Sequence, residues 1–236
     1  MKYTTNPKKL KQMNQHYVEQ QLIQQAHPSL TTLSTDEQYI ANTLACTTGD
    51  MSLFDDLLFS EKAVNTALGA IDKQRTLLCD SHPMIGHLSA RRLKQEPLCF
   101  NQKPTVISQA KAHHQPRSMV AINHWKAHID KSIILLGDTP SALFYLLERL
   151  QQDFAKPALI IAMPAGFQEA PQAKQLLWQQ HQLLGIECII LRGSRGGSVL
   201  TATVMNSLLK LYQQQTQQAT HTTGSQSQLS PIGHYV

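Results

Sequence analysis

Three copies of one pattern in the second half of the chain restrict its fold more than any other feature. Each copy is an apolar segment, then a loop with glycine or proline, then an amphipathic helical segment. The apolar segments are residues 132–136, 157–163 and 186–191, and the helical segments are 141–153, 169–185 and 198–212. Short apolar strands alternating with helices of this length predict an α/β fold, a mainly parallel sheet covered by helices on both faces. The three loops then open at the carboxyl edge of the sheet, where such folds bind ligands.

The first half of the chain is less regular but still divides into elements. Helices are predicted at 7–26, after the capping-box-like Ser34–Glu37, at 103–114 and at 117–129. Strands are predicted at 76–79 and near 97–100. We also expect a helix stop at Gly185, because glycine adopts the left-handed conformation that ends many helices.

The end of the chain has a different character. Residues 213–236 are polar, rich in Gln, Ser and Thr, and have almost no apolar periodicity. Such segments bury too little apolar surface to form a packed core. We therefore expect one domain over residues 1–212 and a C-terminal tail over 213–236.

Composition narrows the class of protein. The net charge of +5 favours an anionic partner, but the basic residues are too dispersed for a nucleic-acid footprint, so no nucleic-acid partner is expected. The longest apolar stretch, residues 158–167, includes Pro164, so neither a membrane span nor secretion is expected. The four cysteines form no Cys-x-x-Cys pair, which argues against a zinc module and a disulfide framework and favours a reduced, cytoplasmic protein.

The loop after the last predicted strand carries the most chemistry. It reads Arg192-Gly193-Ser194-Arg195-Gly196-Gly197-Ser198. Glycines let backbone N–H groups turn toward a ligand, the following helix offers its positive end, and the two arginines add donors for carboxylate or phosphate. The loop is therefore interpreted as an anion cradle, with a plain strand-to-helix turn as the alternative. It matches neither a Walker A loop nor a dinucleotide fingerprint.

Two other positions suggest ligand contacts at the same edge. In the loop Met163–Phe167, Gly166 allows close backbone approach and Phe167 supplies a flat apolar wall, or else Phe167 packs into the core. Arg117 follows Pro116 at a helix start, where a cation is slightly unfavourable, which suggests an anionic contact. A solvated arginine is the alternative.

Histidines supply candidate acids but no complete metal site. His82 and His87 flank Pro83 in the predicted loop after strand 76–79, where either can act as a general acid or simply lie on the surface. His124 and His128 share a helix face, but no third ligand completes a motif, so no metal is expected. A Gly-x-Ser-x-Gly nucleophile elbow is also missing from the sequence.

Taken in order, the motifs resemble those of the precorrin-8X methylmutase (precorrin isomerase) family of corrin biosynthesis. The resembling segments are residues 47–50, 78–80, 116–118, 136–144, 162–167, 192–198 and 206–208. The resemblance implies a three-layer α/β/α single domain and a homodimer with sites at or near the interface. It also implies no redox cofactor and no catalytic metal. The implied reaction moves a methyl group between neighbouring carbons of ring C in a tetrapyrrole polycarboxylate, giving hydrogenobyrinate or, with cobalt, cobyrinate.

The resemblance also implies site residues. The family's proton-handling histidine falls at Cys46, and an upstream Ser-Phe pair falls at Gln20-Gln21. We name Cys46 as the catalytic position and His82 as a substitute acid. The implied substrate-binding residues are Gln20, Thr48, Asp80, Arg117, Met163, Gly166, Phe167, Arg192, Gly193, Ser194, Arg195, Gly196, Gly197 and Ser198.

Three functions are weighed. The leading one is a methylmutase of cobalamin biosynthesis. The second is a relative that binds corrinoid or tetrapyrrole polycarboxylates without turnover, because the arginines are present while Cys46 replaces the acid. The third is a structural α/β protein, which leaves motifs gathered at one sheet edge unexplained.

Overall fold

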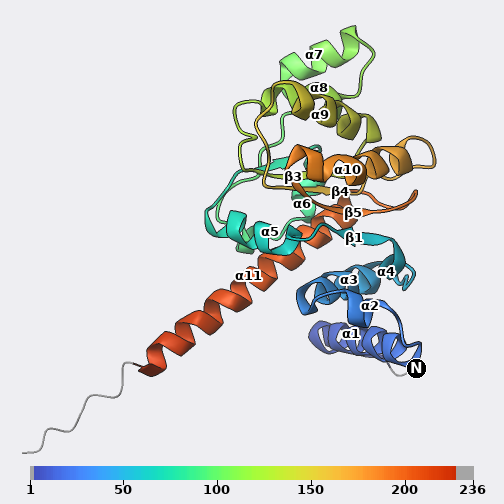
Figure 1. The fold of residues 1–236 in the computed structure, drawn as a ribbon, viewed down its shortest axis with the longest axis vertical. Helices are drawn as coiled ribbons and strands as arrows, with labels where there is room; N and C mark the ends of the chain where they lie inside the picture. Colours follow the sequence, from blue (N-terminus) through green and yellow to red (C-terminus); the bar gives the residue numbers. More distant parts are fainter. Residues whose placement is uncertain (1–2, 227–236) are drawn as a thin grey trace, which may run out of the picture.

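Five short strands form one sheet at the centre of the structure, a computed structural model that describes residues 3–226, with side chains for 3–218 (Figure 1). The strands are β1 (Leu57–Phe59), β2 (Leu77–Cys79), β3 (Ile133–Leu136), β4 (Leu159–Ala162) and β5 (Glu187–Leu191). Their order across the sheet is β1-β5-β4-β3-β2. Strands β2 to β5 are parallel, whereas β1 pairs antiparallel with β5. The predicted, mainly parallel sheet is confirmed.

Helices cover both faces of this sheet. One layer holds α1 (Pro7–Gln24), α2 (Ser29–Thr32), α3 (Thr35–Thr48), α4 (Leu53–Asp56), α5 (Ala63–Asp72), α6 (His82–His87) and α11 (Ser198–Gln226). The other holds α7 (Pro104–Ala112), α8 (Arg117–Ala121), α9 (Pro140–Gln152) and α10 (Ala170–Leu184). Two short 3₁₀ turns, Ala90–Arg92 and Ile122–Trp125, complete the described elements. The arrangement is the expected three-layer α/β/α domain.

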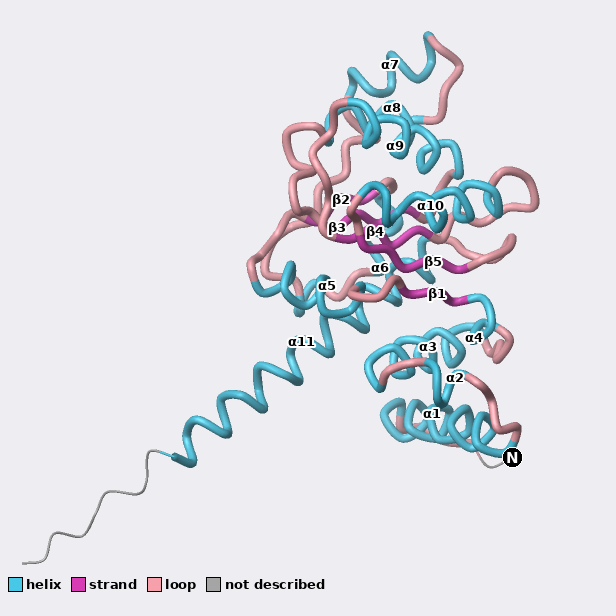
Figure 2. The backbone as a smooth tube through the Cα atoms, in the orientation of Figure 1, coloured by secondary structure: helices cyan, strands magenta, loops and turns pink. Residues whose placement is uncertain are grey.

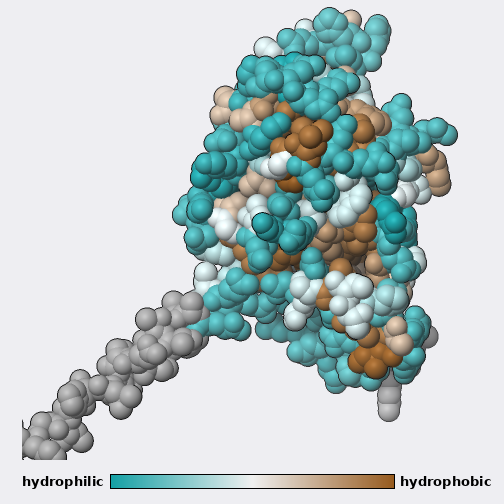
Figure 3. Space-filling model, in the orientation of Figure 1, coloured by the Kyte–Doolittle hydropathy of each residue, from teal (hydrophilic) through white to brown (hydrophobic). Residues whose placement is uncertain are grey.

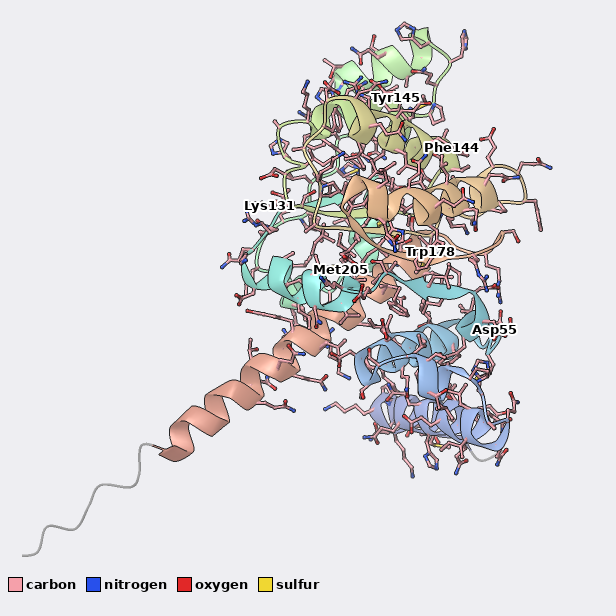
Figure 4. The ribbon with its side chains drawn as sticks, in the orientation of Figure 1. Asp55, Lys131, Phe144, Tyr145, Trp178 and Met205 are labelled. Carbon is pink, nitrogen blue, oxygen red and sulfur yellow. The ribbon has the colours of Figure 1, made fainter. Side chains whose placement is uncertain are left out.

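Alternate strand residues point into two separate hydrophobic cores, as the pleat of a strand requires. Along β3, Ile133 and Leu135 pack with the α11 layer, whereas Ile134 and Leu136 pack with the α9 and α10 layer. Figure 4 shows Met205 of α11, which belongs to the core on the same face of the sheet as Ile133 and Leu135. All four β3 side chains are at most 1% exposed, so the strand is apolar throughout because both faces are covered.

Helix ends in the structure confirm several sequence signals. Ser34 and Glu37 form the reciprocal hydrogen bonds of a capping box at the start of α3. Gly185 ends α10 with φ 65°, in the left-handed region that glycine adopts without strain. Local chemistry thus fixes where these helices begin and end.

Three predictions for the first half are wrong. The segment near 97–100 forms a single bridge, Leu98 with Leu78, rather than a strand, because Leu98 alone exchanges backbone hydrogen bonds with β2. The helix from Arg117 ends at Ala121 and continues as a 3₁₀ turn to Trp125 instead of reaching residue 129. His82 and His87 lie at the two ends of α6, not in a loop, since Pro83 occupies a first-turn position where its missing N–H costs nothing.

The C-terminal helix is longer than its apolar pattern predicts. Helix α11 runs to Gln226 and projects away from the sheet (Figures 1 and 2). The expected boundary between 212 and 213 therefore falls inside this helix and stays a prediction. Residues 227–236 of the expected tail lie outside the described residues.

Apolar side chains also reach the surface. Figure 3 shows hydrophobic colour on the N-terminal helices, and α1 exposes Leu10, Met13 and Tyr17, which are 46%, 51% and 60% exposed. Within residues 3–226 none of the helices combines the length and the apolarity that crossing a bilayer requires.

Candidate functional site

The loops after β2, β3, β4 and β5 meet at the carboxyl edge of the sheet, beside the first turn of α11. Ser81, after β2, lies with its Oγ 3.2 Å from Oγ of Ser198 at the start of α11. Gly137, after β3, sits so close to α11 that an added Cβ would lie 2.9 Å from Cα of Ser198. Glycine at 137 therefore lets the β3–α9 loop contact the α11 N-terminus directly.

Asp80 is the buried acid of this edge. Its side chain is 0% exposed, and its Oδ2 accepts hydrogen bonds from the backbone N–H groups of Gly137 (2.8 Å) and Asp138 (2.7 Å). No described group pairs with its Oδ1. Burial raises the pKa of Asp80 to about 7, against the lowering effect of the two backbone hydrogen bonds. Asp80 thus holds the β3–α9 loop and titrates near neutral pH.

The glycine-rich loop between β5 and α11 is pinned to the loop after β4. Gly166 N–H donates to Ser194 O (2.9 Å), and Gly197 N–H donates to Met163 O (2.6 Å). Gly193 and Gly197 have φ of 74° and 114°, which L side chains rarely adopt. At Gly196 an added Cβ would lie 2.1 Å from Met163 O. The sequence needs glycine there because the two loops are in backbone contact.

The same loop leaves a set of backbone donors unused. Among the described residues, no acceptor pairs with the backbone N–H of Gly193, Ser194, Arg195, Gly196 or Ser198. Successive free N–H groups next to a helix N-terminus form a concavity suited to anions. We call these five N–H groups the cradle.

Arg195 and Arg192 both pair with the N-terminal helices. The Arg195 guanidinium contacts the carboxylates of Asp50 and Asp56 and donates to Ser52 Oγ (2.7 Å). Arg192 donates to Asp55 O (2.6 Å) and lies 3.6 Å from Asp56 Oδ1. A hydrogen bond from Ser52, supported by Arg195, lowers the pKa of Asp50. Contact of Arg195 with substrate stays a prediction, since two carboxylates already occupy its donors.

Arg117 and Phe167 are open to solvent. Arg117 is exposed at the start of α8, and the neighbouring Ser118 has its Oγ 2.7 Å from Thr139 Oγ1, so this helix start lies beside the β3–α9 loop. The Phe167 side chain is 89% exposed. The alternative that Phe167 packs into the core is therefore wrong.

Cys46 lies on α3, in a cavity of about 320 Å³ between α1 and α3 that no residue of the cradle lines. Its thiol donates to Asn42 Oδ1 at 3.2 Å, and burial raises its pKa. Gln20 is exposed on α1 and does not line this cavity. Thr48 is also exposed, and its hydroxyl accepts from Asp50 N–H (3.2 Å), which closes the end of α3. The structure therefore does not bring Gln20 to Cys46.

His82 has a fixed ring orientation that the sequence does not reveal. Its Nδ1 lies 2.7 Å from Asn101 Oδ1, and Asn101 Nδ2 donates to Asp80 O (3.3 Å). Because Oδ1 of an amide only accepts, Nδ1 carries a proton and Nε2 is left to exchange one. Sequence reasoning missed Asn101. The only sequence signal that could have pointed to Asn101 is its position directly after the apolar run 97–100.

Metal ligands do not gather among the side chains of residues 3–218: no three His, Cys, Asp or Glu side chains there lie close enough to hold an ion. The paired His124 and His128 both stack on Phe100, at ring-centroid distances of 5.8 and 5.6 Å.

Comparison with known proteins gives one consistent result. Residues 16–211 match the family model of precorrin-8X methylmutase. The precorrin-8X methylmutase of Pseudomonas aeruginosa is 32% identical over 185 residues, which cover 78% of this chain and 88% of that protein. The cobalt-precorrin-8 methylmutase of Leptospira interrogans is 29% identical over 64% of this chain and 71% of that protein.

A solved structure agrees. The precorrin-8X methylmutase of Thermus thermophilus superposes with a TM-score of 0.76 at 26% identity, over 88% of this chain and 97% of that one. Fold, loop motifs and sequence similarity thus coincide over most of the molecule. The chain belongs to the precorrin-8X methylmutase family.

Proposed function

We propose that the protein is an isomerase that moves a methyl group within ring C of precorrin-8X or cobalt-precorrin-8, in cobalamin biosynthesis. The observation that carries the proposal is the cradle: unpaired backbone N–H groups at the sheet edge, in a chain whose family acts on such tetrapyrroles. A polycarboxylate needs several anion donors at once. The net charge of +5 also favours an anionic substrate.

Substrate binding combines donors with an apolar wall. The cradle and Arg192 lie on the β5 side of the edge, and Arg117 lies beside the β3–α9 loop. Side-chain carboxylates at the rim of one macrocycle can therefore bind at separate points. Phe167, which is 89% exposed, offers a face for the flat ring. Several fixed contacts orient the macrocycle, and orientation lowers the barrier of a rearrangement that needs no second reactant.

We propose His82 as the proton-handling residue. The ring is held by Asn101 through Nδ1, so Nε2 is the atom that gains or loses a proton at the substrate. The Cys46 thiol is a weaker acid than an imidazolium, and burial weakens it further.

The second candidate function is binding of a tetrapyrrole polycarboxylate without turnover. It is favoured by one observation: Cys46, at the position where the resemblance places the family's histidine, donates to Asn42 in a cavity that is separate from the cradle. Under this function Cys46→His raises turnover. Under the leading function its effect is small because His82 carries the proton.

The test is an anaerobic visible-absorption titration with precorrin-8X, following binding and then the spectral change to the product. We expect steady conversion by the wild type, a loss of at least 100-fold in turnover for His82→Ala, and turnover within twofold for His87→Ala. His87 is the matched control, because it lies at the other end of α6 with an exposed side chain. Binding without conversion supports the second function, and absence of binding contradicts both.

We also propose a homodimer in the cytoplasm. Three exposed apolar side chains along α1 support a partner surface there. All four cysteines are free thiols, two of them buried, which suits a reducing compartment.

A further inference from the structure

Lys174 is a buried ammonium group in the second turn of α10. Its side chain is 0% exposed, and its Nζ donates to the backbone carbonyl of Arg195 at 2.8 Å. Burying a charge is costly unless it is paired or hydrogen-bonded. Burial lowers the pKa of Lys174 to about 8, while the carboxylate of Asp56 acts in the opposite direction. A lysine kept in such a place needs a specific reason.

Lys174 supplies the central one of three contacts between the β5–α11 loop and the β4–α10 side of the site. Gly166 N–H binds Ser194 O, Lys174 Nζ binds Arg195 O, and Gly197 N–H binds Met163 O. The carbonyls of Ser194 and Arg195 are thus directed to this side. Since the carbonyls are held, the neighbouring peptide planes are also held, and their N–H groups stay free for a ligand.

The side chain of Arg195 is fixed as firmly as its carbonyl. Its guanidinium contacts Asp50 and Asp56, whose segments belong to the N-terminal helices. Asp56 also acts on Lys174, so one carboxylate offsets two cations. Arg195 is therefore held at both ends, between α10 and the α3–α4 segment. This arrangement matches a rigid support better than a side chain free to bind substrate.

We propose that Lys174 is a positioning residue: by holding the Arg195 carbonyl, it keeps the cradle in the shape that binds a carboxylate of the tetrapyrrole. The identity of that ligand rests on the proposed function, whereas the effect on the loop does not. The two are therefore tested by separate measurements.

The experiment compares Lys174→Met with Leu177→Ala. Methionine fills the buried space without a donor, and Leu177, also 0% exposed, lies on the same face of α10 but in the hydrophobic core, away from the loop. Amide hydrogen exchange, followed by NMR at Gly166 and Gly197, measures how firmly the loop is held. Absorption titration with hydrogenobyrinate, the family's product, measures carboxylate binding. The melting temperature reports on the general packing of α10.

We expect Lys174→Met to speed exchange at Gly197 at least tenfold and to raise the Kd for hydrogenobyrinate at least tenfold, with little change in melting temperature. Leu177→Ala should lower the melting temperature and leave the Kd within twofold. If Lys174→Met does not fold, Lys174→Gln, which keeps a shorter donor, is measured instead and should show a smaller change in the same direction.

Unchanged exchange at Gly197 in the Lys174 variant overturns the proposal, even if binding weakens. Faster exchange with an unchanged Kd also overturns it, because the loop then need not be held for binding. A wild type that does not bind hydrogenobyrinate contradicts the proposed function instead, and the exchange measurement still decides whether Lys174 holds the loop.

Discussion

At the scale of single residues, several charged groups of the site are buried or paired, and their burial or pairing has physical consequences that can be measured. Asp80 is the clearest case, because a fully buried carboxyl accepts two backbone hydrogen bonds through one oxygen and none through the other. The carboxyl of the unfolded chain ionises near pH 4. In the folded protein the pKa of Asp80 is raised to about 7, so protonation and folding are linked.

The sign of this linkage gives a prediction for Asp80→Asn. Between about pH 4 and pH 7 the folded state holds a proton that the unfolded chain has lost, so raising the pH in this window lowers the free energy of unfolding, by up to about 1.4 kcal/mol per pH unit. Asparagine keeps an acceptor for Gly137 and Asp138 but does not titrate. We expect the variant to gain stability relative to the wild type as pH rises from 4.5 to 8, measured by urea unfolding.

The control for this measurement is Asp130→Asn, at an exposed carboxyl outside the site. Its difference from the wild type should stay flat over the same pH range. A flat difference for Asp80→Asn as well shows that the carboxyl ionises normally in the folded protein.

At the scale of elements, the β5–α11 loop depends on backbone contact rather than on side-chain packing. Gly196 faces the carbonyl of Met163, and Gly197 donates to the same oxygen. No rotamer change can relieve a clash between a Cβ and a backbone oxygen, so the loop must shift if glycine is replaced. Glycine at 69, in the middle of α5, is a different case, since an added Cβ there meets nothing within 4 Å.

These two glycines give a matched pair. Gly196→Ala should destabilise the fold by about 2–3 kcal/mol through overpacking and backbone strain, and should abolish binding of the tetrapyrrole at micromolar concentration. Gly69→Ala should stabilise it by about 0.5–1 kcal/mol, because alanine favours a helix interior. Denaturant unfolding and the absorption titration measure both. A Gly196→Ala variant that binds normally would show that the close approach to Met163 is not required.

Elements with a long, regular pattern were predictable, and so was the short strand β2, but other short elements set by tertiary contact were not. Strands β3, β4 and β5 and helices α9 and α10 could be predicted because an apolar run or a helix cap in one continuous stretch of sequence signals each of them. Strand β1 has three residues, and only its antiparallel pairing with β5 makes it a strand. Residues 97–100 show the reverse: this apolar run makes only one bridge to β2, at Leu98, so an apolar run alone does not make a strand.

At the scale of the whole molecule, the site depends on contacts between segments that are far apart in the chain. The sequence motifs could locate the cradle, because parallel strands direct their loops to one edge. They could not reveal that Arg195 pairs with Asp50 and Asp56, or that Lys174 supports its carbonyl, because these partners belong to other elements. Charge pairing across a fold has no local periodicity for a sequence pattern to detect.

The exposed face of α1 leads to the last prediction. Leu10 and Met13 are about half exposed and lie on one helix face, and Leu10 also lines the cavity that holds Cys46. A second copy packed on this face would bury the apolar stripe and close the Cys46 cavity. We expect the wild type to sediment as a dimer at micromolar concentration and the double variant Leu10→Glu/Met13→Glu to sediment as a monomer, because four carboxylates would face one another across a symmetric interface.

Leu183→Glu is the control for that experiment, since Leu183 is 90% exposed but lies on α10, in the opposite helix layer. It should leave the sedimentation coefficient unchanged. A monomeric wild type contradicts the homodimer. A double variant that is still a dimer shows that the interface does not lie on α1. If the double variant is a folded monomer that still binds tetrapyrrole but has lost turnover, then the cradle acts within one protomer while the chemistry needs two.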